Sequence, residues 1–215
     1  MSKPGHMAAK AGPVRTGVIR TGVVRSGMLA ALASVALAGC ISLGPDAPDQ
    51  LFTLTPAARV AAGAGTQGAA VDAVAVMVPN APQQLNVTRV PVHTSDSTLA
   101  YLEDATWVEK PANLFRRLLA ETIRARGNRL VVDGGELEYA AATQLSGQLV
   151  DMGYDVASGS VRVRYDAVLA MPGGQVRTRR FENSVEGVPP LAASVGPALN
   201  QAANQVAVEV ADWVG

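Results

Sequence analysis

Three segments of alternating apolar and polar residues follow one another in the second half of the chain. They span residues 142–154, 160–171 and 176–186. In the middle segment Val161 and Val163 alternate with Arg162 and Arg164. Successive side chains of a strand point to opposite faces, so this pattern predicts strands with one apolar face. Short turns containing glycine or serine separate the segments, and we therefore expect a meander of three antiparallel strands.

Two segments with apolar residues at helical spacing can cover the apolar face of that sheet. The first, residues 107–126, contains Pro111 in its expected first turn and is followed by Gly127. The second runs from about residue 191 to 214, with Leu199 on its apolar stripe. We therefore expect an α+β fold in which two main helices cover one face of a mixed, largely antiparallel sheet. The apolar stripe of the second helix can pack on this sheet or on another copy of the chain. In the second case the protein would be a homo-oligomer.

Four shorter segments also have the pattern of strands: residues 50–55, 71–78, 85–93 and 130–132. Pro91 lacks an amide hydrogen, so we expect its segment at an edge of the sheet. Residues 56–70 are rich in alanine and glycine and predict a flexible, disordered linker. Because the tether before residue 50 and this linker contribute little apolar surface, we expect residues 71–215 to fold alone. The alternative is that residues 50–55 are an integral strand of the sheet, reached across a long loop.

An apolar run near the amino terminus sets the first 39 residues apart from the rest. Residues 28–38 read MLAALASVALA and follow a basic segment that includes Arg25. This run is too short to span a bilayer, which takes about 20 residues. A basic segment, a short apolar run and an exit of small residues predict a secretory signal. The chain thus divides into a basic leader with a signal peptide, a tether and a single α+β domain. Their bounds are residues 1–39, 40–49 and 50–215.

The only cysteine of the chain, Cys40, comes directly after Leu37, Ala38 and Gly39. These four residues resemble the lipobox of bacterial lipoproteins. The resemblance implies that the thiol of Cys40 receives a diacylglyceryl group and that the signal is cleaved between Gly39 and Cys40. It also implies that the new amino terminus is acylated, for example with palmitate. A buried free cysteine beside an ordinary cleavage site is the alternative.

Several acyl chains on one residue anchor a protein to a membrane without spanning it. Residues 41–49 contain two prolines, one glycine and two aspartates, as expected for a solvated tether. Ile41 follows the cysteine where inner-membrane lipoproteins of the enteric type often carry aspartate. This resemblance implies the outer membrane, with the domain facing the periplasm.

The distribution of charge excludes one class of function. The chain has 18 basic and 18 acidic residues, and the first 39 residues hold five of the basic ones and none of the acidic ones. The remainder therefore carries 13 basic against 18 acidic residues. Nucleic-acid binding needs a surplus of lysine and arginine and is not expected. One cysteine and two histidines are too few for a Cys/His zinc site, and no metal or cofactor is expected.

Catalytic candidates are few. His93 would need a nucleophile and an orienting partner to act as a general base, and the sequence shows neither. Asp133, Glu136 and Glu138 cluster near a turn, where they would bind calcium, act in acid–base catalysis or form a solvated turn. We favour the solvated turn and predict no enzymatic activity.

An aromatic and acidic segment is a candidate contact for a partner protein. Tyr101 and Trp107 flank the acidic pair Glu103 and Asp104. Aromatic side chains contribute strongly at interfaces, so this segment has the chemistry of a docking loop. Core packing of the Trp107 ring is the alternative, and we favour it for Trp107.

Arginines gather on the second and third strands of the meander. If these strands pair, the arginines form a basic sheet face for lipid headgroups or an acidic partner. If nearby carboxylates neutralise the arginines, the same face is solvated and binds no partner. Both alternatives fit the sequence equally well. The residues concerned are Arg162, Arg164, Arg177, Arg179 and Arg180, with Asp166, Glu182 and Glu186 as candidate partners.

The order of the parts carries a family resemblance. The parts are Cys40, the strand with Phe52 and Leu54, the valine strand that ends at Pro79, Leu85, Arg89, Tyr101, Trp107, the helix with Leu114, Leu118 and Leu119, the meander and the last helix. This order resembles the ABC-type transport auxiliary lipoproteins, the Pqi-type lipoprotein partners of lipid-transport systems built on MCE proteins. The resemblance covers nearly all of residues 40–215.

This resemblance implies a periplasmic accessory protein without enzymatic activity. Its partners would be an MCE-domain protein with the permease and the ATPase of the same ABC system, and its cargo phospholipid or a similar lipid. A structural or assembly lipoprotein of the outer membrane is the alternative. An anchored hydrolase is a third class, but it needs a polar constellation that the sequence does not show.

Overall fold

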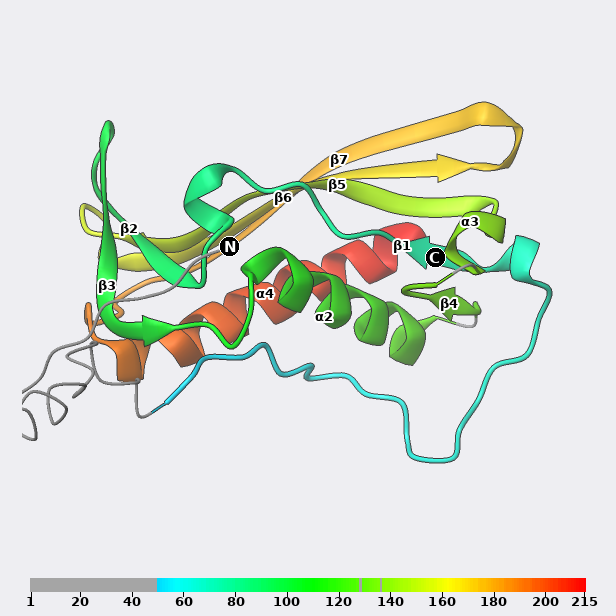
Figure 1. Ribbon diagram of the computed structural model, residues 1–215, viewed down its shortest axis with the longest axis horizontal. Helices are drawn as coiled ribbons and strands as arrows, with labels where there is room; N and C mark the ends of the chain where they lie inside the picture. The colour runs from blue at the N-terminus through cyan, green and yellow to red at the C-terminus, as the bar shows by residue number, and fades with distance from the viewer. Residues whose placement is uncertain (1–49, 128, 136) are drawn as a thin grey trace, which may run out of the picture. The chain divides into compact units, whose positions relative to one another are not determined.

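The computed structural model describes residues 50–215, except residues 128 and 136 (Figure 1). The predicted leader, signal and tether, with Gly39 and Cys40, therefore lie outside the described residues, as does Glu136.

Seven strands form one mixed sheet. They are β1 (Val74–Val76), β2 (Arg89–Ser95), β3 (Thr98–Thr106), β4 (Val131–Val132), β5 (Thr143–Asp155), β6 (Ser160–Met171) and β7 (Gln175–Val185). The long strand β5 organises the sheet, because β1 and β2 both run parallel to it while β6 runs antiparallel to it. β3 continues the sheet beyond β2, β4 continues it beyond β1, and β7 pairs only with β6.

The predicted meander is confirmed in β5, β6 and β7. Its register pairs Leu145 with Leu169 and Tyr165 with Phe181. Along β6 the apolar residues at alternate positions are buried, while Arg162 and its alternate neighbours are partly exposed on the opposite side. We call this opposite side, which is turned away from the two long helices, the outer face of the sheet.

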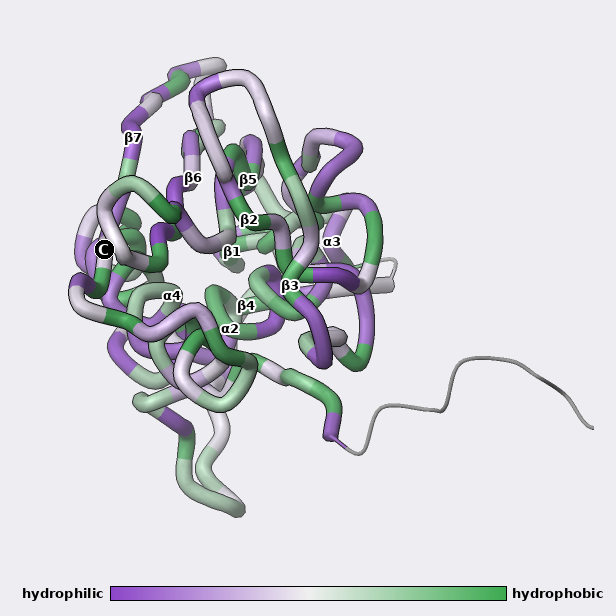
Figure 2. Tube along the Cα trace, turned by 90° about the vertical axis from the view of Figure 1, so that its left-hand side faces the viewer, coloured by the Kyte–Doolittle hydropathy of each residue, from purple (hydrophilic) through white to green (hydrophobic). Residues whose placement is uncertain are grey.

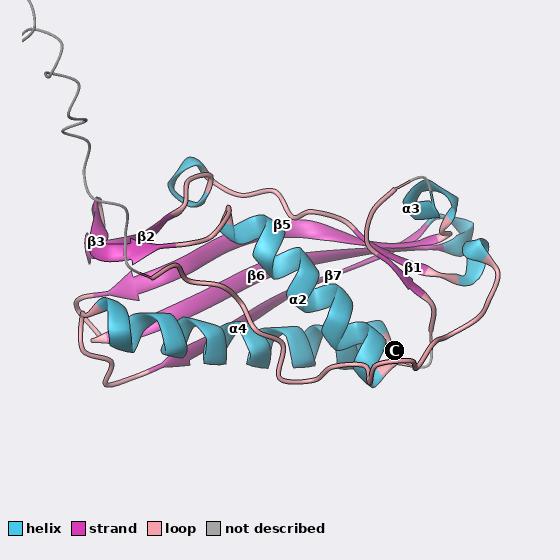
Figure 3. Cartoon of the chain, turned by 60° about the horizontal axis from the view of Figure 1, so that its bottom comes forward, coloured by secondary structure: helices cyan, strands magenta, loops and turns pink. Residues whose placement is uncertain are grey.

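Two long helices, α2 (Pro111–Arg126) and α4 (Ala192–Val214), cover one face of the sheet (Figure 3). Their apolar stripes are buried in the core that they share with β5 and β6. The rings of Phe115 on α2 and Tyr165 on β6, for example, meet edge to face with centroids 5.3 Å apart. The stripe of α4 therefore covers the chain's own sheet, and the predicted α+β fold is confirmed. In the described part of the chain, no helix combines the length and the hydropathy that a membrane crossing requires.

Helix α2 begins four residues later than predicted. Trp107 forms an isolated bridge with Phe52 instead of a helical turn, and Pro111 takes the first helical position. Proline suits this position because the amide that it lacks would have no partner inside the helix. A short third helix, α3 (Leu137–Ala140), follows β4.

The prediction that Pro91 lies in an edge strand is wrong. β2 lies between β3 and β5, and β3 is not among the strands expected from the sequence. The proline is tolerated inside the sheet because the β2–β3 register shifts between Arg89 and Pro91. On the other side Gly153 makes room, since a Cβ atom there would lie 2.5 Å from the Pro91 carbonyl oxygen.

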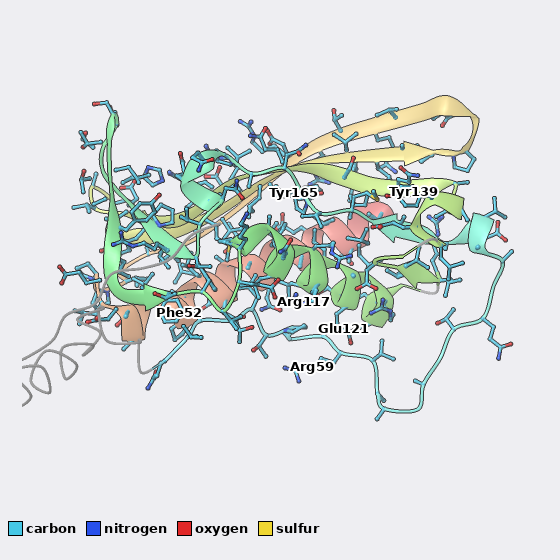
Figure 4. All side chains as sticks on the ribbon, in the orientation of Figure 1. Phe52, Arg59, Arg117, Glu121, Tyr139 and Tyr165 are labelled. Carbon is cyan, nitrogen blue, oxygen red and sulfur yellow. The ribbon has the colours of Figure 1, made fainter. Side chains whose placement is uncertain are left out.

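Residues 50–55 do not form the predicted strand. Phe52 makes the bridge to Trp107, with ring centroids 5.5 Å apart, and Leu54 is buried in the main core. Residues 52–60, which we call the strap, then run along the two long helices (Figure 4). The expected linker thus starts within a segment that is packed against the domain.

Side chains of both helices hold the backbone of the strap. On α4, Asn200 and Asn204 lie one helical turn apart. The amide of Thr55 donates to Asn200 Oδ1 at 2.8 Å, and the amide of Ala57 donates to Asn204 Oδ1 at 2.7 Å. Asn204 Nδ2 donates in turn to the Thr55 carbonyl at 2.9 Å. On α2, Glu121 accepts a hydrogen bond from a third strap amide. These side chains supply hydrogen-bond partners for three backbone amides and one carbonyl of an extended segment that is not part of the sheet.

Candidate functional site

A bulge in β3 builds the candidate site. Arg89 of β2 pairs with Thr106, whereas Pro91 pairs with Tyr101, so residues 102–105 lie opposite Val90 alone. We call residues 102–105 the β3 bulge. Within it Asp104 has a φ of 53°, a left-handed conformation that aspartate tolerates better than most residues. The bulge therefore turns the exposed acidic pair of the segment away from regular pairing.

A cavity of about 340 Å³ separates the β3 bulge from the start of α4. From the β3 side it is lined by Tyr101, Leu102 and the acidic pair, and from the α4 side by Pro190 and Leu191. Leu191 is the N-cap residue of α4, and the residue is 62% exposed. The cavity thus combines apolar walls with an acidic rim.

An arginine fixes one wall of the cavity. The Arg89 guanidinium lies over the Tyr101 ring, 4.6 Å from its centroid, as in a cation–π contact. This contact holds the ring at the cavity wall. Such an arrangement has the chemistry to bind an apolar side chain that has a basic group beside it.

The structure separates the two aromatic residues that the sequence singled out as candidate partner contacts. Tyr101 lines the cavity beside Glu103 and Asp104. Trp107 is 1% exposed and packs in the core, which is the position that we favoured for its ring over a partner contact. Leu191 is a cavity residue that the sequence analysis missed, because its apolar side chain fitted the stripe of the last helix. The two prolines before it were the available signal, since they end the preceding segment and put Leu191 at the helix entrance.

His93 has a partner that the sequence did not reveal. On the outer face its Nε2 lies 3.2 Å from Oδ1 of the buried Asp151, whose Oδ2 accepts a hydrogen bond from Arg162 Nε at 2.9 Å. The cluster joins β2, β5 and β6. Within the described residues, no serine, threonine or cysteine is hydrogen-bonded to the imidazole. His93 therefore has an orienting carboxylate but no nucleophile beside it. The cluster is a set of polar contacts that links three neighbouring strands.

The arginines of the meander do not share one face. Arg162, Arg164 and Arg180 lie on the outer face, and each pairs with a carboxylate. Arg177 and Arg179 lie on the helix side of β7, where they pair in register with buried residues of β6. Carboxylates therefore neutralise the three arginines of the outer face, as in the alternative of a solvated face. Arg177 and Arg179 form a separate group.

Ion pairs shift the pKa values of the outer-face carboxylates. The hydrogen bond from Arg180 lowers the pKa of Asp166, and the hydrogen bond from Arg164 lowers the pKa of Glu182. These carboxyl groups therefore favour their charged forms.

The acidic turn after β4 has the features of a solvated loop. Asp133 Oδ1 accepts a hydrogen bond from Arg124 at 3.3 Å, and Glu138 lies in the short helix α3. Among residues 50–215 that the structure describes, no group of three or more acidic, histidine or cysteine side chains is placed to hold a metal ion.

Solved structures share this fold. A crystal structure of a protein from Xanthomonas campestris, assigned to the family DUF330, matches with a TM-score of 0.59 and 18% identity, covering 79% of this chain and 93% of that one. A crystal structure of an uncharacterized protein matches with a TM-score of 0.59 and 14% identity, covering 77% and 100%. A PelC dodecamer from Paraburkholderia phytofirmans matches with a TM-score of only 0.38 and 18% identity, covering 67% and 92%. A search of curated protein sequences found no match.

The family model for the ABC-type transport auxiliary lipoprotein component matches residues 52–211. The match begins at the first residue of the strap and ends in the last turns of α4. It thus includes the cavity, the meander and both long helices. The description of this family is that of a lipoprotein with an auxiliary role in ABC-type transport. The chain belongs to the ABC-type transport auxiliary lipoprotein family.

Proposed function

We propose that this protein is a lipid-anchored accessory of an MCE-associated ABC system that moves lipid between the membranes of the bacterial envelope. Its partners are an MCE-domain protein and the permease and ATPase of the same system, and its anchor lies in the outer membrane. The observation that carries the proposal is the family match over residues 52–211, which includes nearly every described element. The lipobox-like residues before Cys40 support the anchor.

The cavity beside the β3 bulge is the proposed contact for a protein of that system. The strap enters the domain at this end, because the Phe52 amide donates to the Thr106 carbonyl of β3 at 2.7 Å. Gln50 is the tenth residue after Cys40, so the fully extended chain between them is at most about 35 Å long. The anchor therefore keeps the cavity within reach of a protein embedded in or close to the same membrane.

The test is a pull-down of the full chain, tagged after Gly215, from membranes solubilised in mild detergent. Mass spectrometry of proteins and lipids in the eluate should identify an MCE-domain protein, its permease and ATPase, and phospholipid. Glu103→Lys should reduce the recovery of these proteins several-fold, because it reverses one of the two negative charges of the acidic rim. Asp96→Lys, an exposed acid at the tip of the same hairpin, serves as the matched control and should leave recovery unchanged.

Two results would overturn the proposal. An eluate that contains cell-wall or barrel-assembly proteins and no ABC component would favour a structural or assembly lipoprotein. Equal loss of partners in the Asp96 control would mean that general charge, and not the cavity, governs the contact.

The anchor has its own test. Cys40→Ser should either release a soluble periplasmic protein or leave an uncleaved precursor, since no thiol remains to accept the diacylglyceryl group. The intact mass of the wild-type protein should exceed the mass of residues 40–215 by the mass of its acyl groups. A mature protein without added mass would refute lipidation at Cys40. This result would not bear on the contact at the cavity, which the pull-down tests.

A further inference from the structure

The free edge of β7 carries an unusual set of arginines. β7 pairs only with β6, and among the described residues no strand lies on its other side (Figure 2). The β6–β7 register continues without interruption from Val161 opposite Val185 to Met171 opposite Gln175. Residues 175–180 are all exposed. We call residues 175–180 the basic edge, because they contain three arginines and no acid.

A long and regular edge strand is normally protected against pairing by charged side chains, a bulge, a proline or a covering element. β7 has no bulge in its register with β6 and no proline within its bounds. Every second residue of an edge strand directs its N–H and C=O groups away from its one neighbour. The basic edge therefore offers a backbone template onto which another extended segment can add.

Two of the arginines are held in place by aromatic rings. The Arg177 guanidinium lies 4.9 Å from the centre of the Trp213 ring of α4, and the Arg179 guanidinium lies 4.8 Å from the centre of the Phe181 ring. The two rings themselves meet edge to face at 5.6 Å. The positive charge of the arginines would by itself be enough to protect this edge against pairing with another edge strand, so protection does not require that the rings hold the guanidinium groups. Stacking in addition restricts the guanidinium groups, so that less conformational entropy is lost when they bind an anion.

These two arginines also lack acidic partners. Among the described residues, neither Arg177 nor Arg179 has a carboxylate within the 4.0 Å of an ion pair, whereas Arg180 on the other face of the same strand pairs with Asp166. Residues two apart on a strand are about 7 Å apart and point to the same side. A strand added beside β7 would place its own alternate side chains next to Arg177 and Arg179.

We infer that the basic edge binds an extended acidic segment of a partner protein, in which carboxylates at alternate positions pair with Arg177 and Arg179 while its backbone adds a strand to β7. The charge pattern argues against a second copy of this chain as the occupant. Antiparallel pairing of two β7 edges would bring arginines together. The edge strand β3 has acidic residues that could face the arginines of another copy, but its pairing edge is interrupted by the β3 bulge after Tyr101. This inference is independent of the contact proposed at the cavity.

The test uses the full chain in detergent and a labelled synthetic decapeptide in which glutamate alternates with threonine. Fluorescence anisotropy should show saturable binding. The combined variant Arg177→Gln and Arg179→Gln should weaken binding about tenfold, because two charge-assisted hydrogen bonds are lost at a partly solvated site. Arg180→Gln is the control: it removes one arginine charge from the opposite face of the same strand and should leave affinity nearly unchanged, whereas each of Arg177→Gln and Arg179→Gln alone should weaken binding.

Two further peptides test the backbone pairing. A decapeptide of the same composition with contiguous glutamates should bind more weakly, because only alternate residues reach the arginine side. An alternating peptide with methylated backbone amides on the pairing side should lose binding, because strand addition needs its N–H groups. Binding that is equal for all three peptides would overturn the inference in favour of unspecific charge attraction.

Two other occupants would also overturn it. If vesicles of phosphatidylglycerol bind in a manner that depends on Arg177 and Arg179 while the peptides do not, the edge contacts lipid headgroups. If light scattering reveals an assembly that dissociates in the Arg177→Gln, Arg179→Gln variant, with no peptide binding, the occupant is another copy of the chain.

Discussion

Asp151 is 5% exposed although it lies on the outer face of the sheet, which is turned away from the helices. Its two carboxylate oxygens contact His93 and Arg162, so the side chain joins three strands. A buried charge without a partner is costly, and the same holds for a half-buried arginine left without its carboxylate.

We therefore predict that Asp151→Ala lowers the free energy of unfolding by about 3 kcal/mol. Asp155→Asn is the control, because it removes the more exposed charge that lies 3.9 Å from Arg162 and keeps an oxygen that can accept the hydrogen bonds from Ser158, so it should cost under about 1 kcal/mol. Urea unfolding followed by circular dichroism measures both. Equal losses would show that burial of Asp151 contributes little.

Leu199 provides a second prediction at this scale. Its side chain is fully buried between α4 and the sheet. Leu199→Asp should unfold the monomer, because a charge without a partner would enter the core. Circular dichroism measures whether the variant is folded, and light scattering measures whether it still assembles. A folded monomer that has lost a larger assembly would instead indicate that α4 packs against another copy of the chain.

At the scale of elements, the strap is an integral part of the domain although it is not a strand. The Phe52 ring packs against Trp107 and against the backbone of α4 at Gly196. A Cβ atom at Gly196 would lie 2.9 Å from two atoms of that ring. The absence of a side chain at this position therefore makes room for the strap.

This contact predicts a coupled pair of substitutions. Phe52→Ala should lower the free energy of unfolding by about 2 kcal/mol, less than for a fully buried phenylalanine. Gly196→Ala should destabilise the wild-type chain, because the ring is displaced. In the Phe52→Ala background it should instead stabilise by about 1 kcal/mol, because alanine is the better helix former. Additive effects in a urea-unfolding cycle would show that the ring does not rest on Gly196.

The strap also bears on the expectation that residues 71–215 fold without it. Removing residues 50–70 would expose Trp107 and leave the amide groups of Asn200 and Asn204 without their backbone partners. We now expect such a chain to unfold at lower urea concentration than one that begins at Gln50. Equal midpoints would show that the strap contributes no stability.

At the scale of the whole molecule, the ion pairs of the outer face govern stability in acid. The folded state lowers the pKa of Asp166 through Arg180 and that of Glu182 through Arg164. The backbone amide of Ser158 likewise lowers the pKa of Asp155. In the unfolded chain such groups titrate near pH 4. Their contribution is therefore present above about pH 4 and is lost as the pH falls through the lowered values.

We predict that the free energy of unfolding is nearly constant from pH 7 to pH 5 and falls steeply below about pH 4. In the variant Asp166→Asn, Glu182→Gln, the fall should be shallower, since two of the carboxylates no longer titrate. Urea unfolding at a series of pH values measures the slope. A slope that is identical in the variant would assign acid sensitivity to other groups.

Local patterns in the sequence determined most of the fold. Alternation predicted the meander because each strand of β5–β7 has one buried face, and helical spacing predicted α2 and α4 because each has one buried stripe. The family followed from the order of these parts. Where a residue's environment depends on distant segments, local patterns failed. Pro91 indicated an edge strand, and the opposite bulge in β3 is what allows it inside the sheet.

The candidate sites were decided by tertiary structure. The sequence pointed to Tyr101 and its acidic neighbours because their residue types are typical of interfaces, but the cavity exists only where the β3 bulge meets the start of α4, nearly 90 residues later. In the same way, five arginines on two strands had one pattern in the sequence. Register then divided them, because residues at odd and even positions of a strand face opposite sides, and each side has different neighbours. Arg180 gained a carboxylate, whereas Arg177 gained the ring of Trp213, 36 residues further along the chain.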